Sequence, residues 1–290
     1  MPDPLQPIFV EAPAKLNLTL DVLGKRADGY HALASVMQTI ALHDTIALWP
    51  APEGTITLTC DMPELCGDDN LVVRATRLLQ ATTGCTLGVR IELQKAIPVQ
   101  GGLGGGSSDG AAMLLALNRW WQLDLTQNQL IDLAAQLGSD VPFFIVGGTA
   151  LIEGRGEQVT ALPDLTPLWL VVAKPEVSIA TPAVFRALPP TAYSDGAATR
   201  DLVAHIRTGT LPALTDATLH NALESAVLRN YPAVAATRMY LLQAGAACVR
   251  MSGSGPTLYA PCATLVEAAT VFQAAQAAGV RCWLTHTTPH

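Results

Sequence analysis

The sequence has few charged and few aromatic residues, which make up 14% and 5% of its 290 residues. Its formal net charge is −7, because 17 Lys and Arg stand against 24 Asp and Glu. A nucleic-acid groove needs a basic stripe, so this acidic balance argues against a nucleic-acid partner. It does not exclude nucleotides, since backbone N–H groups can hold phosphates without Lys or Arg.

Long hydrophobic runs are also missing. The most apolar stretch, 111–117, is far too short to cross a bilayer. The first residues have neither the basic nor the apolar region of a signal peptide. We therefore expect a cytoplasmic protein with no membrane partner. The six cysteines form no C-x-x-C pair, and neither they nor the histidines have metal-ligand spacing. We expect reduced, mostly buried thiols and no protein-held metal.

Half of the residues are hydrophobic, which is ample for a core, and the length predicts one or two domains.

In 8–22, polar residues that include Lys15 and Asn17 alternate with apolar ones, which predicts a half-buried strand. Thr126 and Gln129 form a capping box that begins a helix ending at Gly138. Further strands are predicted at 36–42, 45–48, 55–59, 87–93, 168–172, 247–251 and 257–260 and on both sides of 147–148, and helices at 70–81 and 110–121.

Strands and helices are mixed without strict βαβ alternation, which indicates an α+β fold. The stretch 162–167 is rich in proline and marks a domain border. We therefore predict an N-terminal domain at 1–162 and a C-terminal domain at 163–290.

A glycine loop stands out at 101–106, where five of six residues are glycine, followed by Ser107 and Ser108. Glycine lets a ligand approach the backbone, and the start of the following helix attracts negative charge. The serines can cap this helix and offer hydroxyls to a phosphate or a metal. A flexible linker is the alternative interpretation. No lysine follows the last glycine, as a Walker A motif needs, and G-x-G-x-x-G does not fit in any register.

Lys15 and Asp140 are weak signals when taken alone, because a strand lysine is usually solvated and an aspartate in a turn usually caps. Phosphoryl transfer needs such groups, namely a cation for charge stabilisation and a carboxylate that orients or deprotonates the hydroxyl. Their spacing does not show that the two residues meet.

Three segments in order, PAKLNL at 13–18, PVQGGLGGGSS at 98–108 and GSGPT at 253–257, resemble the motifs of the GHMP kinase superfamily. The resemblance covers the whole chain. It implies ATP-dependent phosphorylation of a hydroxyl, with Mg²⁺ as the counter-charge. It also implies two domains, an N-terminal one that is ribosomal-protein-S5-domain-2-like and a C-terminal ferredoxin-like one, with ATP and substrate in the cleft between them.

The segments KRADGYH at 25–31 and LGSDVPFF at 137–144 are similar to one branch of this superfamily. That branch phosphorylates the 2-hydroxyl of a cytidine-diphosphate-linked methylerythritol in non-mevalonate isoprenoid biosynthesis. The resemblance implies Asp140 as the catalytic base and Lys15 as the residue that pairs with it and stabilises charge. It places Asn17 near the acceptor hydroxyls.

The same resemblance assigns the remaining binding residues. Tyr30 and His31 would hold the cytosine, one by stacking and one by hydrogen bonding, with Phe185 on the second side of the stack. Residues 252–255 would close over the active site. Gly110 departs from the alanine usual in the family. The ATP phosphates are assigned to Pro98, Gly101, Gly102, Leu103, Gly104, Gly105, Gly106, Ser107 and Ser108.

Three other functions stay open at this point. The first is a different GHMP kinase, such as a homoserine or mevalonate kinase. The second is a non-catalytic nucleotide-binding protein with the same fold, which would be expected to lack Lys15 or Asp140. The third is an RNA-binding protein with an S5-like fold, which conflicts with the acidic composition. Phe185 and Tyr30 have the ordinary alternatives of a core aromatic and a turn residue. The sequence predicts no oligomeric state.

Overall fold

The computed structural model describes residues 7–210 and 213–290. By their contacts these residues divide into two compact units. The first unit comprises residues up to 14, 43–99 and 104–146, and the second comprises 15–42, 100–103 and the residues from 147 onward. Two long strands, β1 (Ile8–Lys25) and β2 (His31–Ala51), belong to both units. None of the borders falls at 162/163, so that domain border stays a prediction.

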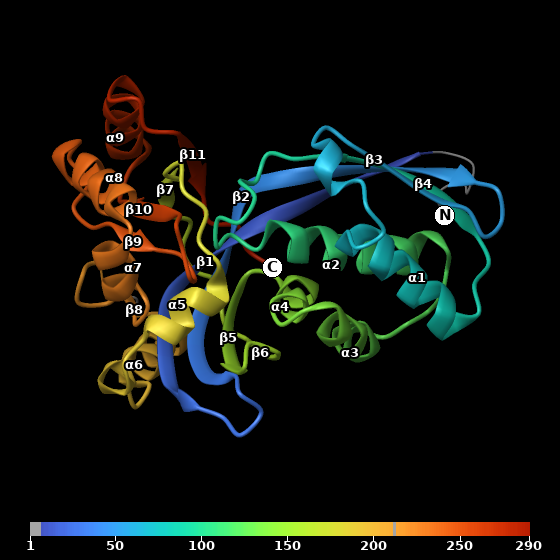
Figure 1. Cartoon of the computed structure of the whole chain (residues 1–290), viewed down its shortest axis with the longest axis horizontal. Helices are drawn as coiled ribbons and strands as arrows, with labels where there is room; N and C mark the ends of the chain where they lie inside the picture. Colours follow the sequence, from blue (N-terminus) through green and yellow to red (C-terminus); the bar gives the residue numbers. More distant parts are fainter. Residues whose placement is uncertain (1–6, 211–212) are drawn as a thin grey trace. The chain divides into compact units, whose positions relative to one another are not determined.

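The first unit combines a small sheet with a layer of helices (Figure 1). The end of β2 pairs antiparallel with β4, and β4 pairs parallel with β3. Asn70 begins α1, because its side chain accepts a hydrogen bond from the amide of Val72 at 3.0 Å. The capping box of Thr126 and Gln129 is confirmed at the start of α3. The elements of this unit are β3 (Ile56–Cys60), η1 (Pro63–Leu65), α1 (Leu71–Thr83), β4 (Gly88–Gln94), α2 (Gly105–Trp120), α3 (Gln127–Leu137) and α4 (Val141–Val146).

Helix α2 begins at Gly105, five residues before the predicted start. Its N-cap is Gly104, with a left-handed φ of 73° and no capping side chain. The prediction that Ser107 and Ser108 cap this helix is therefore wrong, because both lie inside its first turn. Gly110 consequently belongs to the second turn, where a Cβ would lie 3.2 Å from the Cβ of Leu71.

Residues 141–146 form a helix, α4, so the predicted strand before Gly147 is wrong. Pro142 is tolerated because it lies in the first turn, where its missing N–H has no intrahelical partner. The segment is short and apolar, and a run of this kind does not distinguish a strand from a helix.

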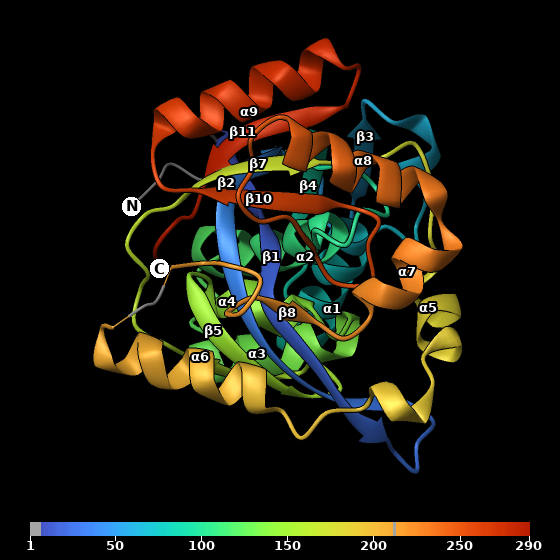
Figure 2. The ribbon, with the colours of Figure 1, turned by 90° about the vertical axis from the view of Figure 1, so that its left-hand side faces the viewer.

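The second unit contains the first part of β2, which pairs antiparallel with β5, and β5 pairs antiparallel with β6. β1 pairs parallel with β8. A separate four-stranded sheet has the order β11-β7-β10-β9 and is covered by α8 and α9 (Figure 2). The elements are β5 (Thr149–Gly154), β6 (Gln158–Ala161), β7 (Trp169–Ala173), α5 (Thr181–Ala187), η2 (Pro190–Ala192), α6 (Ala197–Thr208), β8 (His220–Asn221), α7 (Glu224–Asn230), α8 (Pro232–Gln243), β9 (Arg250–Met251), β10 (Leu258–Cys262), α9 (Leu265–Ala277) and β11 (Cys282–His286).

Residues 15–22 of strand β1 are buried on both faces, and not on one face as predicted. Every residue from 15 to 22 is buried, including the polar Lys15, Asn17, Thr19 and Asp21. Alternation predicted the strand correctly, but it could not show that the polar face is also covered. Since buried polar groups need partners, this face is where a polar site is expected.

The six cysteines are free thiols, but only Cys248 and Cys262 are buried. Cys66 is exposed and the other three are intermediate, so the prediction of mostly buried thiols is wrong. In the described residues, no helix combines the length and the apolar character that crossing a lipid bilayer requires.

Candidate active site

Lys15 and Asn17 meet on the buried polar face of β1, in the second unit. The Nζ of Lys15 donates to the Oδ1 of Asn17 at 2.6 Å, and both residues are almost fully buried. The side-chain amide of Asn17 donates onward to the Oγ of Ser35 at 2.8 Å. Asn17 is therefore held in one orientation, and its oxygen fixes the ammonium of Lys15.

The loop at 252–255 packs on this pair. A Cβ on Gly253 would lie 3.4 Å from both the Nζ of Lys15 and the Oδ1 of Asn17. The backbone amide of Asn17 donates to the Oγ of Ser252 at 3.4 Å. Asn221 fixes the same loop, because its side-chain amide donates to the carbonyl of Gly253 at 2.8 Å. Residues 252–255 thus form one wall around Lys15.

The first part of the glycine loop contacts the same wall. The carbonyl of Gly102 accepts a hydrogen bond from Ser252 Oγ at 3.0 Å, and the carbonyl of Gly101 accepts one from the amide of Thr257 at 3.2 Å. Gly102 has a φ of 77°, and a Cβ there would lie 2.4 Å from the carbonyl oxygen of Ser252. Only glycine fits this position. Leu103 is buried, and its carbonyl accepts a hydrogen bond from the amide of Lys15 at 2.9 Å.

The rest of the loop lies in the first unit, as does the buried Pro98. Gly105 approaches Ile97 so closely that a Cβ would lie 3.0 Å from its Cγ2. Gly106 is exposed and Ser107 is partly exposed. Ser108 is buried, and its hydroxyl has no hydrogen-bond partner among the described residues.

A buried charge cluster, which the sequence did not indicate, lies at the base of this loop. The Nζ of Lys95 contacts Asp44 at 2.5 Å and Asp109 at 2.6 Å, and all three side chains are at most 4% exposed. Asp44 also accepts hydrogen bonds from the amides of Ala96 and Ile97, at 2.6 and 2.8 Å. The cluster therefore joins the chain entering the loop to helix α2, which leaves it.

The cluster holds two carboxylates and one ammonium, which shifts the pKa values of its members. Burial raises the pKa of Asp109 to about 7; Lys95 opposes this rise, and the nearby Asp44 adds to it. Burial acts to lower the pKa of Lys95, but the two carboxylates outweigh it and raise this pKa. No sequence motif marks the cluster, because Asp109 and Asp44 lie 14 and 51 residues from Lys95 along the chain.

Asp140 lies in the first unit, directly before α4 and two residues after Gly138, the C-cap of α3. The sequence predicted its position just past the end of a helix, but it did not predict the helix that follows.

Two of the residues assigned to the cytosine, His31 and Phe185, contact each other in an aromatic cluster of the second unit. His31 opens β2, and its ring stacks on Phe185 with the ring centres 5.1 Å apart and 26° between the planes. Tyr30 is 55% exposed, and the guanidinium carbon of Arg155 lies 5.4 Å from its ring centre. Tyr193 completes the cluster; its ring and that of His31 meet edge to face, with the ring centres 5.8 Å apart. No motif in the sequence marks Tyr193.

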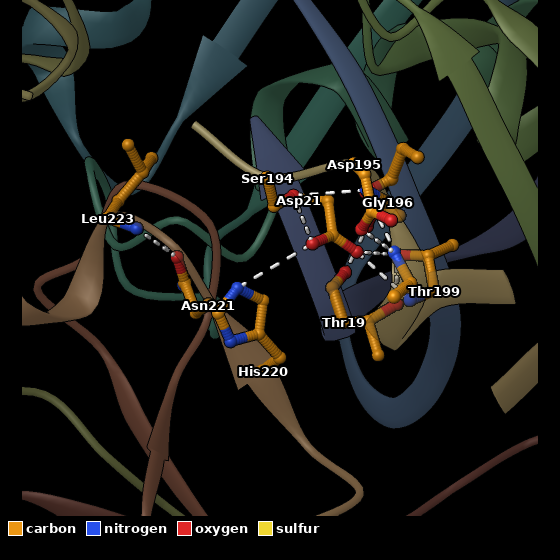
Figure 3. A network of polar contacts seen from close by, with 12 residues as sticks. Thr19, Asp21, Ser194, Asp195, Gly196, Thr199, His220, Asn221 and Leu223 are labelled. Atoms are coloured by element: carbon orange, nitrogen blue, oxygen red, sulfur yellow. Dashed lines mark hydrogen bonds and ion pairs between the residues drawn. The ribbon is translucent and has the colours of Figure 1, made fainter. Parts of the chain in front are cut away.

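Strand β1 also anchors the segment that carries Tyr193 (Figure 3). Asp21 is buried and accepts hydrogen bonds from Ser194 Oγ at 2.6 Å and from the amide of Thr199 at 2.9 Å. The Nε2 of His220 lies 3.7 Å from the same carboxylate. Residues 194–199 are thereby tied to the strand that presents Lys15.

The residues of the glycine loop fit the phosphates of a bound nucleoside triphosphate. The first amides of a helix have no intrahelical partner and attract anions, and α2 begins within the glycine run. Among the described residues, the hydroxyl of Ser108 and the Oδ1 of Asp109 have no hydrogen-bond partner, and such polar atoms suit a phosphate–metal group.

Comparison with known proteins places the chain in a family. Residues 70–148 match the GHMP kinases N terminal domain, and residues 205–281 match the GHMP kinases C terminal domain. A 4-diphosphocytidyl-2-C-methyl-D-erythritol kinase of Pelotomaculum thermopropionicum is 46% identical over 258 residues, which cover 89% of this chain and 90% of that relative. The chain belongs to this family of GHMP kinases.

Solved structures agree with that membership. A crystal structure of a 4-(cytidine 5′-diphospho)-2C-methyl-D-erythritol kinase matches with a TM-score of 0.82 and 34% identity, over 98% of this chain and 100% of that one. A homoserine kinase from Cytophaga hutchinsonii matches with a TM-score of 0.76 and 20% identity, over 98% and 95% of the two chains, and shows the fold alone. The predicted two-domain α+β GHMP kinase fold is confirmed.

The family is made of small-molecule kinases, so this GHMP kinase is an enzyme, and the non-catalytic alternative is excluded. GHMP kinases use ATP as the phosphate donor, generally with Mg²⁺. The relatives' names support the predicted association with isoprenoid biosynthesis.

Proposed function

We propose that this enzyme transfers the γ-phosphoryl group of ATP to the 2-hydroxyl of 4-diphosphocytidyl-2-C-methyl-D-erythritol. A bond forms between the hydroxyl oxygen and the γ-phosphorus, and the bond from that phosphorus to the bridging oxygen of ADP breaks. The hydroxyl proton passes to the carboxylate of Asp140, and ADP leaves.

The observation that carries this proposal is the aromatic cluster of His31, Phe185 and Tyr193, which lies in the same unit as Lys15. A pyrimidine is selected by stacking and by hydrogen bonds to its edge, and this cluster offers both kinds of contact. A homoserine or mevalonate substrate has no base for these rings to contact. The identity to the cytidine-substrate relative over 89% of the chain supports the same choice.

Lys15 is assigned to the developing charge on the transferring phosphoryl group. Its ammonium is held by Asn17 at 2.6 Å, so it needs little reorganisation when that charge appears. Asn17 is assigned to the acceptor hydroxyls, since it lies beside Lys15 on the same face of β1. Asp140 is assigned as the base because its segment matches the family motif.

The ATP phosphates are assigned to the loop from Pro98 to Ser108. The amides at the start of α2 and the hydroxyls of Ser107 and Ser108 are the groups that hold them. Mg²⁺, when bound, supplies positive charge to the phosphate oxygens. The wall at 252–255 fixes the loop from the side of Gly102.

The proposal is tested by ADP release from Mg-ATP with the cytidine substrate, homoserine and mevalonate offered in parallel. We expect turnover above the alcohol-free background with the cytidine substrate alone. Turnover confined to another alcohol would refute the substrate assignment and leave the kinase assignment intact.

A variant tests the role of Asp140. We expect Asp140→Asn to keep its fold and its binding of Mg-ATP and to lose about 10²- to 10⁴-fold in kcat, because the amide cannot accept the hydroxyl proton. Asp132→Asn, at an exposed position on α3, is the matched control. A near-normal rate in Asp140→Asn would show that Asp140 is not the base.

A further inference from the structure

Tyr193 makes a polar contact with His31 that the proposed function leaves unexplained. Its hydroxyl lies 3.3 Å from the Nε2 of His31, and the two rings meet edge to face. The other side of His31 is covered by Phe185. Tyr193 therefore holds one edge of the imidazole and leaves its Nδ1 edge for another partner.

The backbone next to Tyr193 is fixed independently of His31. The amide of Ser194 donates to the carbonyl of Val22 at 3.0 Å, and its hydroxyl donates to the buried carboxylate of Asp21 at 2.6 Å (Figure 3). Tyr193 also packs at the edge of the hydrophobic core of its unit. The backbone beside Tyr193 is thus held by the β1 network, and its ring is packed at the core edge.

The hydrogen bond favours one tautomer of His31. A neutral imidazole carries its hydrogen on one nitrogen and accepts with the other. A phenol donates more readily than it accepts, which favours donation from the hydroxyl of Tyr193 to Nε2 and a hydrogen on Nδ1. Burial, with Lys25 nearby, lowers the pKa of His31, which keeps the ring neutral near pH 7.

We propose that Tyr193 is a positioning residue for base recognition, which fixes His31 so that its Nδ1–H is offered to a hydrogen-bond acceptor on the pyrimidine. This inference rests on the proposed function. The N3 atom of cytosine is an acceptor, whereas N3 of uracil carries a hydrogen and is a donor. A fixed N–H facing this position accepts cytosine and rejects uracil, because two donors then face each other.

Tyr193→Phe tests the inference, since it removes the hydroxyl and keeps the ring edge against His31. Without that hydrogen bond, we expect the KM for the cytidine substrate to rise about three- to tenfold. The kcat and the KM for Mg-ATP should stay within about twofold, because neither the reacting groups nor the phosphate loop is changed. The preference in kcat/KM for the cytidine over the matching uridine substrate should fall by a similar factor. Tyr240→Phe, at a half-exposed position on α8, is the matched control.

The outcomes separate this inference from the proposed function. A wild-type enzyme that does not turn over the cytidine substrate overturns both. Turnover in the wild type, with an unchanged KM and an unchanged base preference in Tyr193→Phe, overturns the inference alone. An equal rise in KM for both bases overturns it as well, because that result indicates packing and not base choice.

A second measurement does not depend on activity. Nitrogen-15 NMR of the histidine rings reports which nitrogen of His31 carries the hydrogen, with His31→Gln used to assign the signal. We expect the Nδ1–H form in the wild type and a mixture of tautomers in Tyr193→Phe. A wild-type ring with its hydrogen on Nε2 would overturn the inference.

Discussion

Lys95 is placed between two buried carboxylates, Asp44 and Asp109, and its single positive charge does not neutralise both. Isolated buried charges are costly, and one way to reduce the cost is for a carboxyl to keep its proton. The pKa of about 7 for Asp109, with burial as its main cause, corresponds to this response. The cluster at the base of the glycine loop therefore contains a carboxyl group, that of Asp109, whose protonation changes near neutral pH.

The raised pKa of Asp109 makes the stability of the protein depend on pH in a definite direction. An acid whose pKa is raised on folding, here from 3.8 to about 7, binds its proton more tightly in the folded chain. The resulting stabilisation is fully present below the unfolded pKa and is lost as the pH rises through the folded value. We predict that the free energy of unfolding of the wild type, relative to Asp109→Asn, falls from pH 5 to pH 7 by at most about 1.4 kcal/mol per pH unit.

Denaturant titrations at pH 5, 6, 7 and 8 measure this difference. Asp132→Asn, on the exposed face of α3, should give a difference from the wild type that does not change with pH. A difference between wild type and Asp109→Asn that is equally flat from pH 5 to pH 8 would contradict the prediction.

Residues of the candidate site differ in how far the sequence could predict them. Lys15 and Asn17 follow from alternation along one strand, and the structure joins them directly. Asp44 and Tyr193 could not be predicted, because their partners are brought near by pairing and packing between distant segments. Local patterns carry no information on such contacts.

At the scale of elements, the contact between the glycine loop and the 252–255 wall depends on one residue without a side chain. Gly102 combines a left-handed φ of 77° with backbone contact, since a Cβ would lie 2.4 Å from the carbonyl oxygen of Ser252. Gly54 has a similar φ of 71°, but a Cβ there would have no neighbouring atom within 4 Å, so this position isolates the cost of the backbone conformation.

We predict that Gly54→Ala destabilises the protein by about 1–2 kcal/mol through its left-handed backbone alone. Gly102→Ala should cost about 1–3 kcal/mol more, because the added methyl group displaces backbone atoms. It should also raise the KM for Mg-ATP, whereas Gly54→Ala should leave that value unchanged. Denaturant titration and steady-state kinetics measure the two effects. Equal losses of stability in the two variants would contradict this prediction, because residues 252–255 would then accommodate the methyl group with no loss of free energy.

Most elements were predictable from the sequence, but their ends were less so. The periodicities of β1 and α3 are regular, and the capping box of α3 marks its start. The start of α2 was placed too late, because a run of glycines has low helix propensity and periodicity does not reveal the left-handed turn at Gly104. α4 was missed because six apolar residues suit a strand as well as a helix.

At the scale of the whole molecule, the six thiols differ widely in exposure and acidity. Burial, with Asp216 nearby, raises the pKa of Cys248 to about 12. Burial, with Glu267 nearby, raises the pKa of Cys262 to about 11. Cys66 is the exposed thiol. Since the thiolate is the reactive form, native reactivity should follow exposure and pKa together.

We predict that a thiol-specific reagent labels Cys66 first in the native protein, and Cys248 and Cys262 last. Absorbance at pH 8 follows the reaction, and all six thiols should react in denaturant. Cys66→Ser should remove the fastest phase, whereas Cys85→Ser should retain it. A fast phase that persists in Cys66→Ser would contradict the prediction, because a less exposed thiol would then react as fast as Cys66.

The two units are not separated by a single border in the sequence. Residues 15–42 belong to the unit formed mainly by the later part of the chain, although they lie near its beginning. Composition marks a border only where the chain passes once from one unit to the next. Here β1 and β2 each cross from one unit to the other, so no proline-rich stretch accompanies the change.

Strand β1 sets the spacing between polar side chains of the second unit. Lys15, Asn17 and Asp21 lie on one face of it, and the six-residue step from Lys15 to Asp21 spans about 20 Å of extended chain. A substitution in this strand changes one side chain and leaves the faces of the others unchanged. Inserting or deleting a single residue between Asn17 and Asp21 would turn one end to the opposite face, separating the Lys15 ammonium from the Asp21 anchor in a single step. The length of this strand is therefore constrained more tightly than its composition.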